Sequence, residues 1–201
     1  MQTEIEAKFL NIDATQIREK LKRIGARLVF AERLMKRKVF DYPDSRLEKI
    51  GGWIRVRDEG GGKITFSYKR LVDRTVHGTK EITVDVSNFE TTCQLLSAIE
   101  LEEKSFQETK REKWLCDTIE ITIDTWPWIP TFVELEANTE DELKEIVHKL
   151  GLDWSQALHG SVETAYQKYY DVTEQEINSW KLITFNPVPG WLETKRKPVV
   201  L

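Results

Sequence analysis

The sequence predicts an α+β fold in which eight mainly antiparallel strands close into a barrel or tunnel, with helices at its periphery. Three observations support this prediction. Eight short runs alternate apolar and polar residues or are rich in β-branched residues, which is typical of strands. The order of strand, helix and three strands occurs twice along the chain. Closing such a sheet into a barrel would also remove its exposed strand edges.

The first predicted strand lies almost at the start of the chain. In the segment EIEAKFL, residues 4–10, Glu4, Glu6 and Lys8 fall on one face and apolar residues on the other, because successive strand side chains point to opposite faces. Glycines at 60–62 indicate a hairpin turn between the third and fourth strands. The strands are predicted near residues 3–10, 28–41, 52–58, 63–70, 78–86, 104–116, 118–125 and 131–137.

Three helices are predicted from residue pairs that resemble capping boxes, each followed by an apolar stripe with helical spacing. The first helix is expected to end at Gly25 and the third at Gly151, since glycine commonly terminates helices. The tail from about residue 150 is expected to be helical, with ordered coil at 186–191. The capping pairs are Asp13 with Gln16, Ser87 with Glu90, and Thr139 with Glu142.

The composition indicates one domain. We expect the main domain to span residues 1–171 and a C-terminal extension, residues 172–201, to pack on it. The 201 residues include 30 basic and 34 acidic side chains, giving a net charge of −4. This balance does not favour nucleic-acid or anionic-membrane partners through the bulk field. Two cysteines without CxxC spacing, and no apolar run of membrane length, predict a cytoplasmic protein with reduced thiols.

The polar faces of the strands differ in the sign of their charge. Carboxylate pairs occur on the first and last strands, whereas arginines and lysines occur on the middle ones. For any single strand, a solvated face of a half-buried sheet explains such alternation. Segregation of charge by strand is better explained by one interior site, because carboxylates bind hard divalent cations and Arg and Lys bind phosphate oxygens. The pattern predicts a site for a metal-bound polyphosphate.

The segment Glu4-Ile5-Glu6-Ala7-Lys8 resembles the ExExK signature of the CYTH superfamily, the triphosphate tunnel metalloenzymes. This superfamily includes class IV adenylate cyclases, thiamine triphosphatases and inorganic triphosphatases. The resemblance continues in order through five further blocks and covers about residues 3–170. The further blocks are KVFDYPD (38–44), WIRVRDEGGGKITFSYK (53–69), KEITV (80–84), EITID (120–124) and FVELEA (132–137).

The resemblance implies an eight-stranded tunnel with a charged lumen that binds Mg²⁺ or Mn²⁺ together with a triphosphate. The implied metal ligands are Glu4, Glu6, Glu134 and Glu136, assisted by Asp124. The residues implied to bind the triphosphate, which together form the triphosphate clamp, are Lys8, Arg55, Arg57, Lys69, Arg111 and Lys113. The residues expected to act in catalysis are Lys8, Arg57, Lys69 and Glu81.

Two features depart from the family pattern. Many members carry Lys-x-Arg on the sixth strand, but Thr109 precedes Arg111 here, so Lys113 is the expected substitute. The second strand carries basic residues on both faces, and the lumen side of residues 33–40 is left open.

The first functional prediction is metal-dependent hydrolysis of a triphosphate such as tripolyphosphate, thiamine triphosphate or ATP. A class IV-type adenylate cyclase, which makes cyclic AMP and pyrophosphate from ATP, would use the same clamp. A non-catalytic protein that binds polyphosphate or nucleotides is the third alternative. The aromatic-rich tail is expected either to cap one tunnel mouth or to mediate a homodimer, and the sequence does not decide between them.

Overall fold

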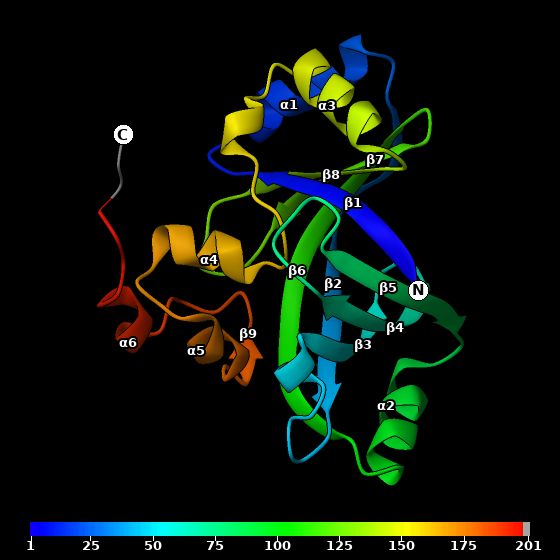
Figure 1. Cartoon of the computed structure of the whole chain (residues 1–201), viewed down its shortest axis with the longest axis vertical. Coiled ribbons are helices and arrows are strands. Elements are labelled where there is room, and N and C mark those ends of the chain that lie inside the picture. The colour runs from blue at the N-terminus through cyan, green and yellow to red at the C-terminus, as the bar shows by residue number, and fades with distance from the viewer. Residues whose placement is uncertain (199–201) are drawn as a thin grey trace.

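The computed structural model describes residues 1–198, and within them eight strands form a closed antiparallel barrel, as predicted (Figure 1). The order around the barrel is β2-β3-β4-β5-β1-β8-β7-β6, and pairing of β2 with β6 closes it. The strands are β1 Gln2–Phe9, β2 Arg27–Asp41, β3 Gly52–Asp58, β4 Ile64–Leu71, β5 Thr79–Val86, β6 Glu102–Cys116, β7 Ile119–Thr125 and β8 Phe132–Ala137.

The helices lie outside the barrel. Figure 1 shows α1 and α3 together at the top of the view, α2 at the bottom, and α4, α5 and α6 beside β6. Short 3₁₀ turns η1 and η2 connect other elements. The bounds are α1 Ala14–Arg23, η1 Glu48–Ile50, α2 Phe89–Ala98, α3 Glu140–Lys149, η2 Trp154–Gln156, α4 Glu163–Tyr169, α5 Glu174–Asn178 and α6 Gly190–Glu193.

Two of the three predicted caps are confirmed. Asp13 accepts hydrogen bonds at the start of α1, and Thr139 forms a reciprocal capping box at α3. The predicted cap Ser87 is wrong, because α2 begins one residue later with Asn88, whose side chain accepts from the Thr91 amide. Ser and Asn are similarly favoured as N-cap residues, so the sequence alone does not indicate which of these two adjacent residues caps the helix.

The tail is less helical than predicted. A two-residue strand, β9 (Leu182–Ile183), pairs with β6 in parallel orientation. The segment 186–191 is coil as far as Pro189, but α6 starts at Gly190. A strand of two residues has no periodicity to detect, which explains the omission. The last three residues of the predicted extension lie outside the described part.

The buried apolar residues form three clusters around the barrel. One lies under α1 and α3, against β1, β7 and β8, and includes Leu21 and Leu143. A second joins α4, α5 and the tail to the segment 126–132, and a third lies under α2. Most outward strand faces contribute apolar residues to these clusters, and most polar strand residues face inward. No helix among residues 1–198 has the length and apolar character needed to cross a membrane.

Gly51, which precedes β3, is expected to be intolerant of alanine. Its φ of 72° is in the left-handed region, and an added Cβ would overlap the Leu71 carbonyl oxygen. Gly51→Ala should lower the free energy of unfolding by about 3 kcal/mol in urea denaturation. Gly62→Ala is the matched control, since its φ is 86° but the described structure has no atom within 4 Å of the new Cβ. It should cost only about 1 kcal/mol; equal losses would contradict the overlap.

Candidate functional site

Inward side chains from all eight barrel strands line one cavity of about 470 Å³. All of the site residues expected from sequence, except Asp124, are on its wall. Ionic side chains thus converge on the interior, as the charge pattern predicts. The lining residues among those expected are Glu4, Glu6, Lys8, Arg55, Arg57, Lys69, Glu81, Arg111, Lys113, Glu134 and Glu136.

Strand β1 contributes three charged residues that are almost fully buried. Glu4, Glu6 and Lys8 are 6%, 7% and 4% exposed. Lys69 on β4 donates to both carboxylate oxygens of Glu4, at 2.9 and 2.8 Å. Lys8 donates to Glu6 at 3.1 Å and to the carbonyl oxygen of Gly160 at 2.6 Å. Buried charges require such partners, and here the lysines compensate the carboxylates.

Three carboxylates form a row across adjacent strands. Glu6 on β1 is directly opposite Glu136 on β8, which is directly opposite Glu120 on β7. Side chains opposite each other on neighbouring strands are about 5 Å apart, and like charges there repel. Burial, and then the charge of Glu120, raise the pKa of Glu136 to about 7. Burial is also the main reason that the pKa of Glu4 is raised to about 8. A divalent cation would relieve this crowding.

These residues suit Mg²⁺ or Mn²⁺ in their chemistry, because every donor is a carboxylate oxygen. Within residues 1–198, however, no group of three or more His, Cys, Asp or Glu side chains is gathered as ligands would be around an ion. Lys8 and Lys69 instead contact the β1 carboxylates. A cation would have to displace or join these lysines.

Asp124 has a different environment from the other expected ligands. Its carboxylate accepts two hydrogen bonds from Arg111, both 2.6 Å long, and it is 1% exposed. It does not contribute to the cavity wall in the described structure. The geometry therefore makes Asp124 the partner that orients Arg111, and its role as an assisting metal ligand stays a prediction.

Four arginines lie around the same part of the lumen, and three of them have carboxylate partners. Arg55 contacts Glu81 at 3.1 Å, Arg57 contacts Glu59 at 2.5 Å, and Arg111 is bound by its aspartate. Glu81 is on β5, two strands from Arg55, Glu59 follows β3 in the hairpin, and Asp124 is on β7, next to the strand of Arg111. The guanidinium groups therefore point into the cavity in fixed orientations.

Arg37 on β2 is the fourth arginine, and the sequence did not identify it as a site residue. It is 6% exposed and donates to the hydroxyl of Thr109 at 2.7 Å, and its guanidinium lies 4.6 Å from the ring of Trp126. Among residues 1–198 it has no carboxylate within ion-pair distance. Burial, followed by the charges of Arg57 and Arg55, lowers the pKa of Arg37 well below its ordinary value.

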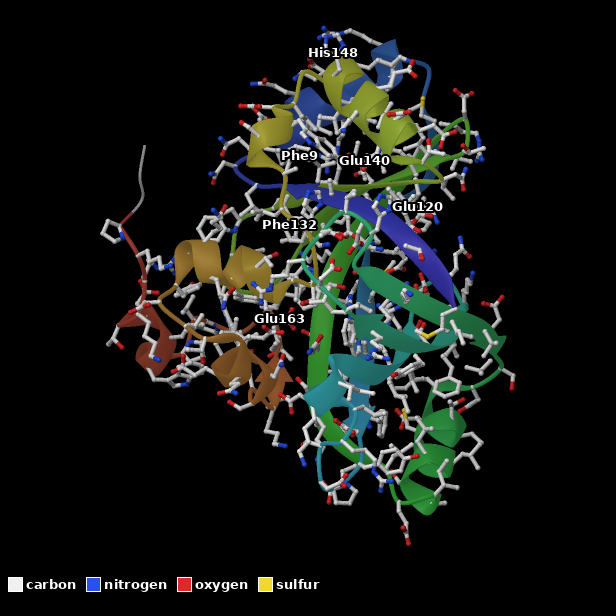
Figure 2. All side chains as sticks on the ribbon, in the orientation of Figure 1. Phe9, Glu120, Phe132, Glu140, His148 and Glu163 are labelled. Atoms are coloured by element: carbon white, nitrogen blue, oxygen red, sulfur yellow. The ribbon has the colours of Figure 1, made fainter. Side chains whose placement is uncertain are left out.

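Other lining residues were also missed. The alternation of Arg55 and Arg57 continues to Glu59, which the prediction omitted because it is beyond the strand in the hairpin. Despite its burial, the charge of Arg57 lowers the pKa of Glu59 to about 2. Glu163 is the first residue of α4, at the helix end nearer the barrel in the view of Figure 2, and it lines the cavity. It is on a helix, so no strand pattern could identify it. Burial raises the pKa of Glu163 to about 7.

The Glu81 carboxylate contacts two basic residues of the triphosphate clamp. It contacts Arg55 at 3.1 Å and Lys69 at 3.4 Å. Although burial opposes ionisation, a hydrogen bond from Glu4 and the charge of Lys69 hold the pKa of Glu81 well below its ordinary value. An ionised Glu81 is a weak base, and its contacts suit it to orienting the two cations.

Comparison with known proteins adds independent findings. The sequence profile of the CYTH domain matches residues 2–170. No curated protein matches the chain. Many solved structures are similar, among them three from different sources. PH1819 from Pyrococcus horikoshii OT3 has TM-score 0.64 at 20% identity, with 82% of this chain and 99% of that chain covered.

The other two structures carry functional descriptions. A candidate adenylate cyclase from Vibrio parahaemolyticus has TM-score 0.70 at 15% identity, over 83% of this chain and 98% of that chain. A candidate adenylyl cyclase from Hippeastrum, described as having a dominant triphosphatase activity, has TM-score 0.57 at 11% identity, over 89% and 95%. At such low identities, the likeness to these structures shows a shared fold.

Proposed function

The chain belongs to the CYTH domain family, and on this basis we propose that it hydrolyses a triphosphate inside the tunnel with the help of Mg²⁺ or Mn²⁺. Water attacks the terminal phosphorus, the terminal P–O anhydride bond breaks, and the products are orthophosphate and a diphosphate.

One observation carries the proposal: the buried Arg37 guanidinium faces three other arginines without a carboxylate of its own among residues 1–198. Burying like charges together is costly unless an anion compensates them. Arginine binds phosphate oxygens with two parallel hydrogen bonds. Several guanidiniums lining one cavity therefore favour a ligand with several phosphate groups.

The lumen residues would act mainly by positioning and charge stabilisation, which dominate phosphoryl transfer. Arg57, Lys8 and Lys69 bind phosphate oxygens and stabilise the charge that develops on the leaving diphosphate. Glu81 holds Arg55 and Lys69 in orientation. The carboxylate row of Glu6, Glu120 and Glu136, with Glu4 and Glu134 beside it, would hold the cation. When bound, the cation supplies charge neutralisation and activation of water.

The direct test uses purified protein with tripolyphosphate, thiamine triphosphate or ATP, each with Mg²⁺ or Mn²⁺. We expect orthophosphate release from at least one substrate. A chelator should abolish the release and either added cation should restore it. Binding of every substrate without turnover would contradict hydrolysis and support a non-catalytic binding protein.

Adenylate cyclisation is the second candidate, and the extent of the cavity favours it. Beside Lys69, the lining includes the apolar residues Trp53 and Leu71. Space of this kind suits a nucleoside, whose 3′-hydroxyl would attack the innermost phosphorus and release pyrophosphate. Cyclic AMP, measured in the same ATP reactions, distinguishes this candidate from hydrolysis.

A further inference from the structure

The C-terminal extension contributes to the wall of the tunnel cavity. The CYTH profile ends at residue 170, yet Ile177 and Asn178 of α5 and Ile183 of β9 line the cavity. In Figure 1, α5 and β9 lie beside β6, and β9 pairs with that strand. A segment outside the matched domain therefore helps to define what the cavity accepts.

The extension is fixed to the barrel by hydrogen bonds and aromatic packing. Ser105 on β6 donates its hydroxyl to the carbonyl oxygen of Trp180 at 2.7 Å. The amide of Phe106 donates to the Lys181 carbonyl oxygen at 2.9 Å, and β9 then pairs with β6. The Trp180 ring packs against Tyr166 with ring centroids 5.3 Å apart. These contacts make the extension an ordered wall.

The loop before β3 forms the facing wall. The Asp41 carboxylate accepts from the amides of Leu47 and Glu48, at 3.1 and 2.9 Å, and so fixes the loop. At one mouth of the tunnel, where the loop meets the extension, the Asn178 side-chain amide donates to the Glu48 carboxylate at 3.3 Å. Both residues are exposed to solvent and both line the cavity. The extension and the loop therefore meet at one mouth.

Apolar side chains connect this mouth to the clamp. Trp53 is half-buried on the cavity wall, and on the neighbouring strand it is opposite Lys69. Leu71 and the buried Ile177 and Ile183 add aliphatic surface. A cavity of about 470 Å³ is within the range of ~300–1,000 Å³ that holds organic ligands. The surface near the mouth suits a flat ring better than another phosphate.

We propose that the extension and the loop before β3 form a subsite for a planar organic group attached to the triphosphate, one with an N–H donor at its edge. The donor would bind the Glu48 carboxylate and the side-chain oxygen of Asn178, while the ring contacts Trp53 and Ile177. This inference rests on the proposed function, because the triphosphate clamp places the organic group at the mouth.

The test compares ATP, purine riboside triphosphate and tripolyphosphate with wild type, Asn178→Leu and Glu48→Gln. ATP carries an amino group at the ring edge, purine riboside triphosphate has the same ring with only a hydrogen there, and tripolyphosphate has no ring. Either substitution should lower affinity and kcat/KM for ATP about tenfold. Tripolyphosphate should change by less than about twofold, and purine riboside triphosphate by less than ATP. Gln175→Leu is the control, since this exposed α5 residue is not among the described lining residues.

The outcomes separate this inference from the proposed function. Equal losses for ATP and tripolyphosphate, or no loss for ATP, would overturn the subsite. If wild type hydrolyses none of the three compounds, the proposed function fails. Equilibrium affinities measured by calorimetry still test the subsite in that case, because they need no turnover. A selective loss of ATP affinity in both mouth variants, absent in Gln175→Leu, would support it.

Discussion

Glu136→Gln is expected to lower cation-dependent turnover by about two to three orders of magnitude while stabilising the metal-free protein. Glu136 is directly opposite Glu6 and Glu120 on the neighbouring strands. The described structure gives it no ion pair of its own. Removing its charge relieves repulsion within the row of carboxylates, but it also removes a ligand from the expected cation site.

The stability gain should depend on pH. Burial and the charge of Glu120 raise the folded-state pKa of Glu136 from 4.5 to about 7. Between these values the folded state holds a proton that the unfolded state has lost, so wild-type stability falls as pH rises through this window. With a chelator present, Glu136→Gln should exceed wild type by about 1–2 kcal/mol at pH 8 and match it near pH 4.5.

Urea denaturation at the two pH values measures this difference, and orthophosphate release with added Mg²⁺ measures turnover. Thermal unfolding gives a further readout, because Mg²⁺ should raise the melting temperature of wild type more than that of the variant. Glu32→Gln, an exposed change on β2, is the control for the substitution itself. A variant that is less stable at pH 8, or that keeps its response to Mg²⁺, would remove Glu136 from the cation site.

The barrel could be predicted because most of its strands have one apolar face and one polar face. On most strands apolar residues face outward and polar residues face the lumen, so the alternation indicates where each of these strands begins and ends; β2 and β6 are less regular. The predicted third and fifth strands differ from β3 and β5 by at most one residue at either end. By contrast, β9 and the short helices of the tail have too few residues to establish a period.

The location of charges was predictable, but their partners were not. Alternation identifies which side chains of a strand share a face, whereas pairing depends on register between strands that are distant in sequence. Asp124 is an example: its position opposite Arg111 on β6 makes it an arginine partner. Arg37 is another example. Basic residues occur on both faces of β2, so its inward face is evident only from the pairing of β2 with β3 and β6.

Arg37→Met is the second variant with a large expected effect. It should weaken tripolyphosphate binding about 30-fold, equivalent to about 2 kcal/mol, because a buried charge-assisted contact to phosphate is lost. In the free protein the same change should raise stability, since the guanidinium of Arg37 is buried near those of Arg55 and Arg57. Calorimetric titration and urea denaturation measure the two effects. Tighter or unchanged binding would exclude Arg37 from the phosphate site.

A second substitution tests whether a positive charge near position 37 is sufficient for binding or whether the arginine guanidinium itself is needed. Thr109 is buried and its hydroxyl is 2.7 Å from the Arg37 guanidinium, so a lysine at 109 would bring its ammonium group into the same region. Thr109→Lys in the Arg37→Met background should therefore recover most of the lost affinity. Thr109→Lys alone should destabilise the free protein, because it adds a cation beside Arg37. If the double variant binds no better than Arg37→Met, then charge at this place in the lumen is insufficient, and the geometry of the guanidinium itself carries the binding.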